Sequence, residues 1–131
     1  MSTQFRVSEA AALLGVSDDT IRRWADAGRL ALTGSPASID GVQLAELAQE
    51  LAADSALSTA FPAARASARN RVSGIVTRVT KGTVMAQVDI QAGPFRIVSL
   101  ISREAVDELG LEPGVLATAS IKATDVGVEL L

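Results

Sequence analysis

The spacing of apolar side chains changes once along this chain, near Ser67, and that change limits the folds it can adopt. Before position 54, apolar residues recur every three or four positions, as on one face of a helix. After Ser67 they recur every second position, as in a half-buried strand, most clearly from Val84 to Ile90. We therefore predict an α+β protein with a helical N-terminal half and a β-rich C-terminal half.

Capping signals divide the N-terminal half into three short helices. Ser8 and Ser17 are suited to begin the first two, because a serine hydroxyl accepts a hydrogen bond from a free helix amide, and Asp40 is suited to begin the third. Gly15 and Gly28 are suited to end the first two helices. The apolar positions predict one small core, made of Val7, Ala11, Leu14, Val16, Ile21, Ala25 and Leu30, with Val42, Leu44, Leu47, Ala48 and Leu51 on the third helix.

Turn residues complete this outline. The segment LALTGSPASI, between the second and third helices, predicts a short hairpin around Gly34 and Pro36. In the C-terminal half, Ser102 is suited to cap a helix over residues 103–109 that Gly110 ends. The predicted strands are residues 71–80, 84–90, 95–101, 115–121 and 126–130. Three strands, a helix and two strands in this order fit a small OB-like barrel.

The domain boundaries follow from composition. Residues 55–66 are rich in Ala and Ser and contain Pro62, which predicts a linker. It separates an N-terminal domain over residues 1–54 from a C-terminal domain over residues 67–131. No apolar run approaches the roughly 20 residues needed to span a bilayer, and the first residues lack the pattern of a signal peptide. We expect a cytoplasmic protein without a membrane partner.

The absence of two residue types narrows the chemistry. The chain has no cysteine and no histidine, which excludes disulfides and thiolate metal sites and removes the commonest general base. No nucleophile–base pair and no phosphate-cradling glycine loop is visible. We therefore expect no enzyme activity, no directly coordinated metal cation and no organic cofactor.

Two segments of the C-terminal half combine residues that suit a small anion. SARNRVSG contains Ser67 and Arg69, and SIKATDVGVEL contains Lys122. Together they offer a hydroxyl, two cationic side chains and backbone amides, and neither segment has a group that titrates near pH 7. This set predicts a binding site for a fully ionised anion rather than a site for acid–base chemistry.

The N-terminal domain resembles the MerR-like and excisionase-like winged helix-turn-helix proteins. The resemblance rests on FRVSEAAALLGVSDDTIRRWADAGRL, beginning at Phe5. In that family the second helix enters the DNA major groove and the hairpin wing reaches the backbone. The resemblance implies that double-stranded DNA contacts Ser17, Thr20, Arg22, Arg23 and Trp24. The chain departs from the family in its wing, because TGSPASI carries none of the arginines that are usual there.

The C-terminal domain resembles a single Mop (molbindin, TOBE-type) domain. The motifs are SARNRVSGIV, KGTVMAQVDI, ISREAVDELGL, EPG and SIKATDVGVEL. The resemblance implies molybdate or tungstate bound between subunits, by Ser67, Ala68, Arg69, Ser102, Lys122 and Ala123. Ser102 stands where the family often has Thr. Because this chain has one such domain, its sites imply a homo-oligomer, with a dimer as the minimal unit and a hexamer as the possible full assembly.

Two functions remain open at this point. The first is a molybdate- or tungstate-responsive transcriptional regulator. The second is an oxyanion storage or buffering protein whose helical domain serves only assembly. The second function is favoured by the wing, which has no arginine, and by the charge of the first sixty residues, which contain four arginines and eight acidic residues. Non-specific DNA binding depends mainly on neutralising phosphates, so a net acidic domain is poorly suited to it.

Overall fold

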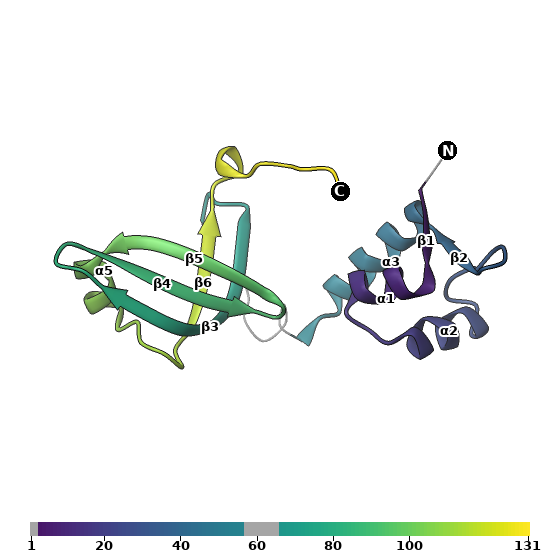
Figure 1. The fold of residues 1–131 in the computed structure, drawn as a ribbon, viewed down its shortest axis with the longest axis horizontal. Helices are drawn as coiled ribbons and strands as arrows, with labels where there is room; N and C mark the ends of the chain where they lie inside the picture. Colours follow the sequence, from purple (N-terminus) through teal and green to yellow (C-terminus); the bar gives the residue numbers. More distant parts are fainter. Residues whose placement is uncertain (1–2, 57–65) are drawn as a thin grey trace. The chain divides into compact units, whose positions relative to one another are not determined.

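The computed structural model describes residues 3–56 and 66–131, which belong to two compact units, Met1–Ala60 and Phe61–Leu131. The first unit is helical and the second is built on a curled antiparallel sheet, so the predicted α+β fold class is confirmed (Figure 1). Residues 57–65, which make up most of the predicted linker, lie outside the described residues. No helix in the described ranges is both long enough and apolar enough to cross a membrane.

The N-terminal unit contains a two-stranded sheet and three helices in its described part. In chain order these are β1 (Gln4–Arg6), α1 (Val7–Leu14), α2 (Asp18–Asp26), β2 (Ser38–Asp40) and α3 (Gly41–Ala53). β1 and β2 are antiparallel, with Phe5 opposite Ile39. The predicted hairpin after α2 has one bridge, between Thr33 and Ser38, and Ser38 also lies opposite Arg6 of β1.

The start of α1 differs from the prediction. The helix begins at Val7, after Arg6 as its N-cap, so Ser8 lies inside the helix and does not cap it. The Glu9 carboxylate takes over the capping role, because its Oε1 accepts a hydrogen bond from the Arg6 amide at 2.9 Å. The acidic side chain in the first turn therefore bonds back to the N-cap amide, as in a capping box.

The other predicted helix ends are mostly confirmed. Ser17 caps α2, and its Oγ accepts a hydrogen bond from the Thr20 amide at 3.1 Å. Gly28 adopts the left-handed conformation, with φ of 80°, just past the end of α2. Asp40 is the N-cap residue of α3, yet it makes no side-chain capping bond; its Oδ1 accepts from the Gln4 side chain at 3.1 Å.

The predicted core of the N-terminal unit is confirmed on α1 and α2 and only partly on α3. Ile21 and Leu44 are among its buried residues. Val42 is 58% exposed and Ala48 is also exposed, so both were wrongly assigned to the apolar face. Val42 lies two residues from Leu44, which is about 200° of helix rotation, so the two side chains face opposite ways.

The C-terminal unit is a four-stranded sheet with one helix. In chain order its elements are β3 (Asn70–Lys81), β4 (Met85–Ala92), β5 (Phe95–Ser102), α5 (Arg103–Leu109), β6 (Leu116–Ile121) and a 3₁₀ turn (Ala123–Asp125). The strand order is β5-β4-β3-β6, and every neighbouring pair is antiparallel. The sheet therefore has two edge strands, β5 and β6.

β3 gives the sheet its curl because its two halves pair with different strands. Its first half, from Asn70 to Ile75, pairs with β6, and the rest pairs with β4. A register shift lies between Val76 and Arg78. Figure 1 shows the first half of β3 and β6 side by side, at a steep angle to the rest of the sheet. Gly74 permits this bend, since a Cβ there would overlap the backbone of Gln91.

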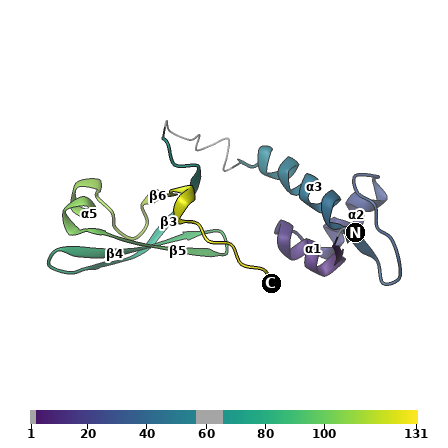
Figure 2. The ribbon, with the colours of Figure 1, turned by 90° about the horizontal axis from the view of Figure 1, so that it is seen from above.

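The predicted closing strand over residues 126–130 does not form in the single chain. After the 3₁₀ turn the chain pairs with none of the described strands (Figure 2). Val128 is 89% exposed and Leu130 is 99% exposed. The sheet is therefore a curled half-barrel, and an apolar groove of about 610 Å³ runs between β5 and β6. The tail segment whose alternating pattern predicted a strand has no strand partner among the described residues of the same chain.

The core of the C-terminal unit follows the alternation along β4, with two exceptions. Ala86, Val88 and Ile90 are buried as predicted. Val84 is 72% exposed, because it lies in the turn before β4. Asp89, expected on the solvent side, is only 6% exposed: its two carboxylate oxygens bind neighbouring polar side chains.

Those partners lower the pKa of the Asp89 carboxyl. Gln87 donates to Oδ1 at 3.1 Å, and the Arg96 guanidinium donates two hydrogen bonds to Oδ2 at 2.9 and 2.7 Å. Both partners favour the charged form of the carboxylate. Because the folded pKa is below the unfolded one, the stabilisation is present above the ordinary aspartate pKa of about 3.9 and is lost as the pH falls through the folded pKa.

This linkage makes a testable prediction. Asp89→Asn should be less stable than the parent at pH 7, and the difference in melting temperature should shrink as the pH falls below about 4. Thermal unfolding followed by circular dichroism between pH 7 and pH 3 measures both variants, with Glu112→Gln at an exposed site as the control. A difference that stays constant over this range would show that the Asp89 charge is not the cause.

Candidate functional site

The sheet brings five of the predicted anion ligands together at one end of β3. Residues 67–69 lead into β3, and residues 122–123 follow β6. Asn70 lies opposite Ile121, and its side-chain amide donates a hydrogen bond to the Ile121 carbonyl at 3.2 Å. This pairing places the two segments side by side. We refer to residues 67–69 and 122–123 together as the β3–β6 end.

The sixth predicted ligand, Ser102, lies elsewhere in the same chain. It ends β5 opposite Met85, close to where Lys81 ends β3. Asn70 and Lys81 are the two termini of a twelve-residue strand, whose length along the backbone is roughly 36 Å. Figures 1 and 2 show α5 and the 3₁₀ turn at different ends of the curled sheet. One chain therefore does not bring Ser102 to the β3–β6 end.

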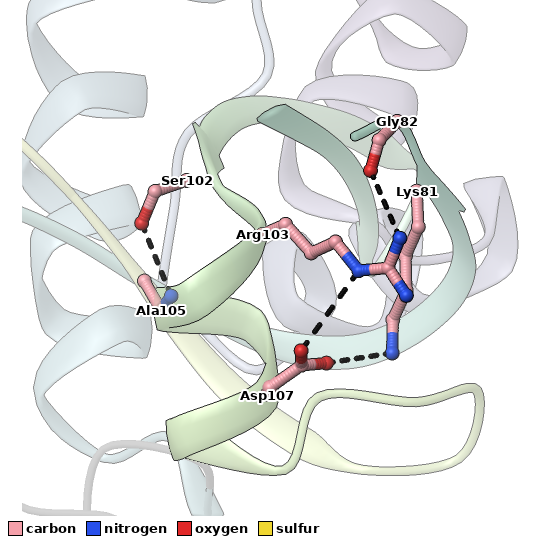
Figure 3. Close-up of polar contacts among 6 residues, drawn as sticks. All are labelled: Lys81, Gly82, Ser102, Arg103, Ala105 and Asp107. Atoms are coloured by element: carbon pink, nitrogen blue, oxygen red, sulfur yellow. Dashed lines mark hydrogen bonds and ion pairs between the residues drawn. The ribbon is translucent and has the colours of Figure 1, made fainter. Parts of the chain in front are cut away.

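Ser102 sits at the start of α5, in a small polar network (Figure 3). Its Oγ accepts a hydrogen bond from the Ala105 amide at 3.1 Å, which confirms its predicted capping role. The backbone amide of Arg103 donates to the Val84 carbonyl at 2.8 Å. These two bonds fix the orientation of the first turn of α5 against the turn that joins β3 to β4.

Two cations, one at the end of β3 and one at the start of α5, are held by one carboxylate. Lys81 Nζ donates to Asp107 Oδ1 at 2.7 Å, and Arg103 Nε lies 3.9 Å from Asp107 Oδ2. Arg103 also donates to the Gly82 carbonyl at 3.3 Å. The hydrogen bond from Lys81, followed by the charges of Lys81 and Arg103, lowers the pKa of the Asp107 carboxyl. We refer to Ser102 with this network as the α5 end.

The two ends carry opposite net charge. At the α5 end, two cations face three acids, and a shallow hollow of about 480 Å³ there is lined by Thr83, Val84, Ser102, Arg103, Glu104, Asp107 and Glu108. The β3–β6 end has two cations, Arg69 and Lys122, and the adjoining 3₁₀ turn contains one acid, Asp125. The first end is thus net negative and the second net positive.

In the N-terminal unit, three of the predicted DNA contacts form one hydrogen-bonded series on α2. Ser17 Oγ lies 3.0 Å from Thr20 Oγ1, and Arg23 Nη2 donates to Thr20 Oγ1 at 3.1 Å. Ser17 and Arg23 are exposed, and Thr20 is half-buried. The arginine is therefore held in a defined position while its remaining donors face solvent.

Arg22 lies on another side of α2. It lines a cleft of about 380 Å³ between the start of α1 and the segment before β2, together with Arg6, Ser8, Asp18 and Pro36. Consecutive helix residues are separated by about 100°, so Arg22 and Arg23 point in different directions. The structure thus gives these two arginines different surroundings.

Trp24, the last predicted DNA contact, is half-buried and packs against the core of the N-terminal unit. The guanidinium of Arg29 lies over the Trp24 ring, and its Cζ is 4.9 Å from the ring centroid. The structure places Trp24 between the core and Arg29. Arg29 was not among the predicted contacts.

Comparison with known proteins follows this division into two units. The helix-turn-helix domain family matches residues 5–50, and the TOBE domain family matches residues 66–128. Molybdenum-pterin-binding protein 1 of Clostridium pasteurianum is 46% identical over 61 residues, 46% of this chain and 90% of that protein. A probable molybdenum-pterin-binding protein of Haemophilus influenzae is 47% identical over 66 residues, 48% of this chain and 96% of that protein. The chain belongs to the TOBE (Mop) family.

A solved structure supports the same assignment. A molybdate-binding protein from Sporomusa ovata matches with a TM-score of 0.50 and 34% identity, covering 51% of this chain and the whole of that one. The β-rich unit is thus a TOBE domain, and the helical unit is a helix-turn-helix domain, as both resemblances predicted.

Sequence patterns gave no direct indication of the network around Ser102. Arg103 and Asp107 are four residues apart on α5, which is a usual spacing for an ion pair on a helix. The position of Lys81 depends on the turn between β3 and β4, so its contact with Asp107 required the folded TOBE domain. The sequence did contain a local indication for Arg29, because this residue directly follows Gly28, the residue predicted to end α2.

The cap of α5 makes a prediction for the TOBE domain. Ser102→Ala removes the hydrogen bond to the Ala105 amide and should lower the free energy of unfolding by about 1 kcal/mol. Ser102→Thr keeps the hydroxyl and should lose much less. Chemical denaturation compares them with Ser120→Ala, at an exposed serine on β6. Equal stability of Ser102→Ala and Ser120→Ala would contradict the capping role.

Proposed function

We propose that this protein is a molybdate- or tungstate-responsive DNA-binding transcriptional regulator that binds the oxyanion between subunits. The observation that carries the proposal is the division of the site. Five of the six candidate ligands lie at the β3–β6 end, and Ser102 lies at the α5 end of the same chain. A complete site therefore needs the β3–β6 end of one copy and the α5 end of another.

The chemistry of the donors supports an oxyanion. Molybdate and tungstate are tetrahedral dianions at neutral pH, and they accept hydrogen bonds on all sides. Arg69 and Lys122 supply charge-assisted bonds, which are stronger than neutral ones. Ser67 and Ser102 supply hydroxyl groups, and the backbone at Ala68 and Ala123 completes the set. None of these groups has to lose a proton for the anion to bind.

Charge and shape support association between copies. The net positive β3–β6 end and the net negative α5 end of a second copy complement each other, which favours a defined orientation. Each chain also leaves an apolar groove between β5 and β6, and its C-terminal tail exposes the apolar side chains of Val126, Val128, Leu130 and Leu131. Exposed apolar surface of this kind is typical of interaction sites. We propose a homo-oligomer, with a dimer as the minimal unit and a hexamer as the possible full assembly.

The helix-turn-helix domain supports a DNA partner. In such domains the second helix enters the major groove, and here that helix is α2, with Ser17, Thr20 and Arg23 joined by side-chain hydrogen bonds. Arg22, on another side of α2, and Trp24 complete the set of contacts that the family resemblance implies. An oxyanion that links TOBE domains would also fix the spacing of the attached DNA-binding heads, and it would shift the population of assemblies that fit the operator.

A storage or buffering protein is the second candidate, and one observation favours it. The first sixty residues carry four arginines against eight acids, which opposes binding to the phosphate backbone. Under either function we propose a cytoplasmic protein without enzyme activity, organic cofactor or coordinated metal cation. In the described part of the chain no group of three or more acidic side chains gathers to hold a metal ion.

The oxyanion site can be tested by removing its charges. Lys122→Ala and Arg69→Ala should each weaken molybdate binding by about 2–5 kcal/mol, because each leaves part of a desolvated dianion without its partner. Isothermal titration calorimetry with molybdate, tungstate and sulfate measures the effect. Arg78→Ala removes an exposed cation outside the site and serves as the control. If both variants bind molybdate as tightly as the control, the proposed site is wrong.

The assembly can be tested by mass. Light scattering at micromolar protein should give a dimer or a larger closed oligomer. Because the bound anion would link two chains, molybdate at a hundredfold excess over its dissociation constant should stabilise the fold by about 2.7 kcal/mol. A monomer mass both with and without molybdate would contradict an interfacial site.

The DNA-binding role can be tested on α2. Arg22→Ala and Arg23→Ala should each weaken binding to DNA from upstream of the protein's own gene, while molybdate affinity stays unchanged. Loss of one phosphate contact should lower the slope of log affinity against log salt by about one unit. Gel shifts over a range of salt concentrations measure the slope. Unchanged affinity and slope in both variants would favour the storage function.

A further inference from the structure

The helix-turn-helix domain contains a cation that the proposed DNA contacts do not include. The segment TGSPASI at the wing position has no basic residue, so it offers no charge to a DNA phosphate. Arg29 lies immediately before this region, between α2 and the Thr33–Ser38 bridge. It is exposed and, within the described residues, forms no ion pair with an acidic side chain.

The backbone of Arg29 is fixed by the way α2 ends. Gly28 has a positive φ of 80°, which places the following residue back over the last turn of the helix. The amide of Gly28 donates to the Ala25 carbonyl at 3.1 Å, and the amide of Arg29 donates to the Trp24 carbonyl at 2.9 Å. These two bonds form the Schellman arrangement, which leaves Arg29 little conformational freedom.

The side chain of Arg29 is held by the same tryptophan. Its Cζ lies 4.9 Å from the centroid of the Trp24 ring, within the range of a cation–π interaction. Trp24 also packs against the core of the domain. Trp24 therefore binds Arg29 through both its backbone carbonyl and its ring, and the contact leaves the guanidinium hydrogens available to an acceptor.

We propose that Arg29 is a DNA phosphate contact and that Trp24 is its positioning residue rather than a direct DNA contact. This inference rests on the proposed DNA-binding function. Arg29 follows the C-terminus of α2, at the edge of the surface that would enter the groove, where helix-turn-helix proteins meet the sugar-phosphate backbone. It supplies at the base of the wing the charge that the wing itself lacks.

The pre-ordering of Arg29 matters because the domain has an excess of acids. A flexible cation loses conformational entropy when it binds a phosphate, whereas a guanidinium already stacked on an aromatic ring loses less. Of the two arginines among the proposed contacts, Arg23 is hydrogen-bonded to Thr20 and Arg22 shares its cleft with Asp18. Among the described residues Arg29 forms no ion pair with an acidic side chain, and it is the cation best prepared for a phosphate.

The test compares Arg29→Ala with the parent on two duplexes: the one that the parent selects from a random-sequence library with molybdate present, and a scrambled version of it. For each helix-turn-helix domain that binds the duplex, Arg29→Ala should lower the slope of log affinity against log salt concentration by about 0.9. The affinity at 0.1 M salt should fall by about eightfold. The loss should be equal on both duplexes, because a phosphate contact carries no sequence information. Arg78→Ala, in the TOBE domain, is the matched control for loss of one positive charge.

Variants of Trp24 test the positioning role. Trp24→Leu should weaken DNA binding while retaining the parental salt slope, since the charge of Arg29 remains, and Trp24→Phe should restore much of the affinity. Molybdate titration and circular dichroism establish that the variants are folded. Trp24 is the sole tryptophan, so its fluorescence should change on DNA binding in the parent and change less in Arg29→Ala.

The outcomes separate this inference from the proposed function. If the parent binds DNA and Arg29→Ala has the same affinity and salt slope, the inference is overturned while the DNA-binding function stands. A loss confined to the selected duplex would also overturn it, because Arg29 would then contact a base. If the parent binds neither duplex at low salt, both the DNA-binding function and this inference fail.

Discussion

The double pairing of β3 is the constraint on which the rest of the TOBE domain depends. Its first half pairs with β6 and its second half with β4, and the bend between them requires Gly74, where any Cβ would meet the backbone of Gln91. The same strand separates the hydroxyl of Ser102 from the cations at the β3–β6 end. In the proposed site these two ends are incomplete half-sites, and their opposite net charges would favour contact between different copies.

Under the proposed function, this separation would link anion binding to assembly and, through assembly, to DNA. With four arginines and eight acids in its half of the chain, the helix-turn-helix domain is expected to bind DNA weakly by itself. When two helix-turn-helix domains are joined through their TOBE domains and one binds a duplex, the second is held near it at a high effective concentration. The combined affinity of the pair then exceeds that of either domain alone. Pre-ordered cations such as Arg23 and Arg29 limit the entropy lost by each head.

Capping and turn residues, which act within a few positions of the chain, predicted much of the fold. The predictions that were wrong concern contacts between residues distant in sequence. Ser17 and Gly28 act within one helical turn, so their roles as cap and stop were visible in the sequence. The burial of Asp89 depends on Arg96 from the next strand, and the tail over residues 126–130 has strand periodicity without a strand partner in its own chain. The candidate ligands were predicted from motifs, but their division between two ends depends on the register of β3. Whether they bind the anion remains a prediction.

The most direct test of this account mixes two defective proteins. Ser102→Ala and Lys122→Ala alter different ends, so a mixed dimer would contain one doubly altered site and one intact site. With random pairing, co-refolding equal amounts should restore about a quarter of the parental molybdate sites, measured by calorimetry at a ligand concentration where neither variant alone binds. A mixture that binds no more molybdate than the separate variants would place the whole site within one chain and contradict the account.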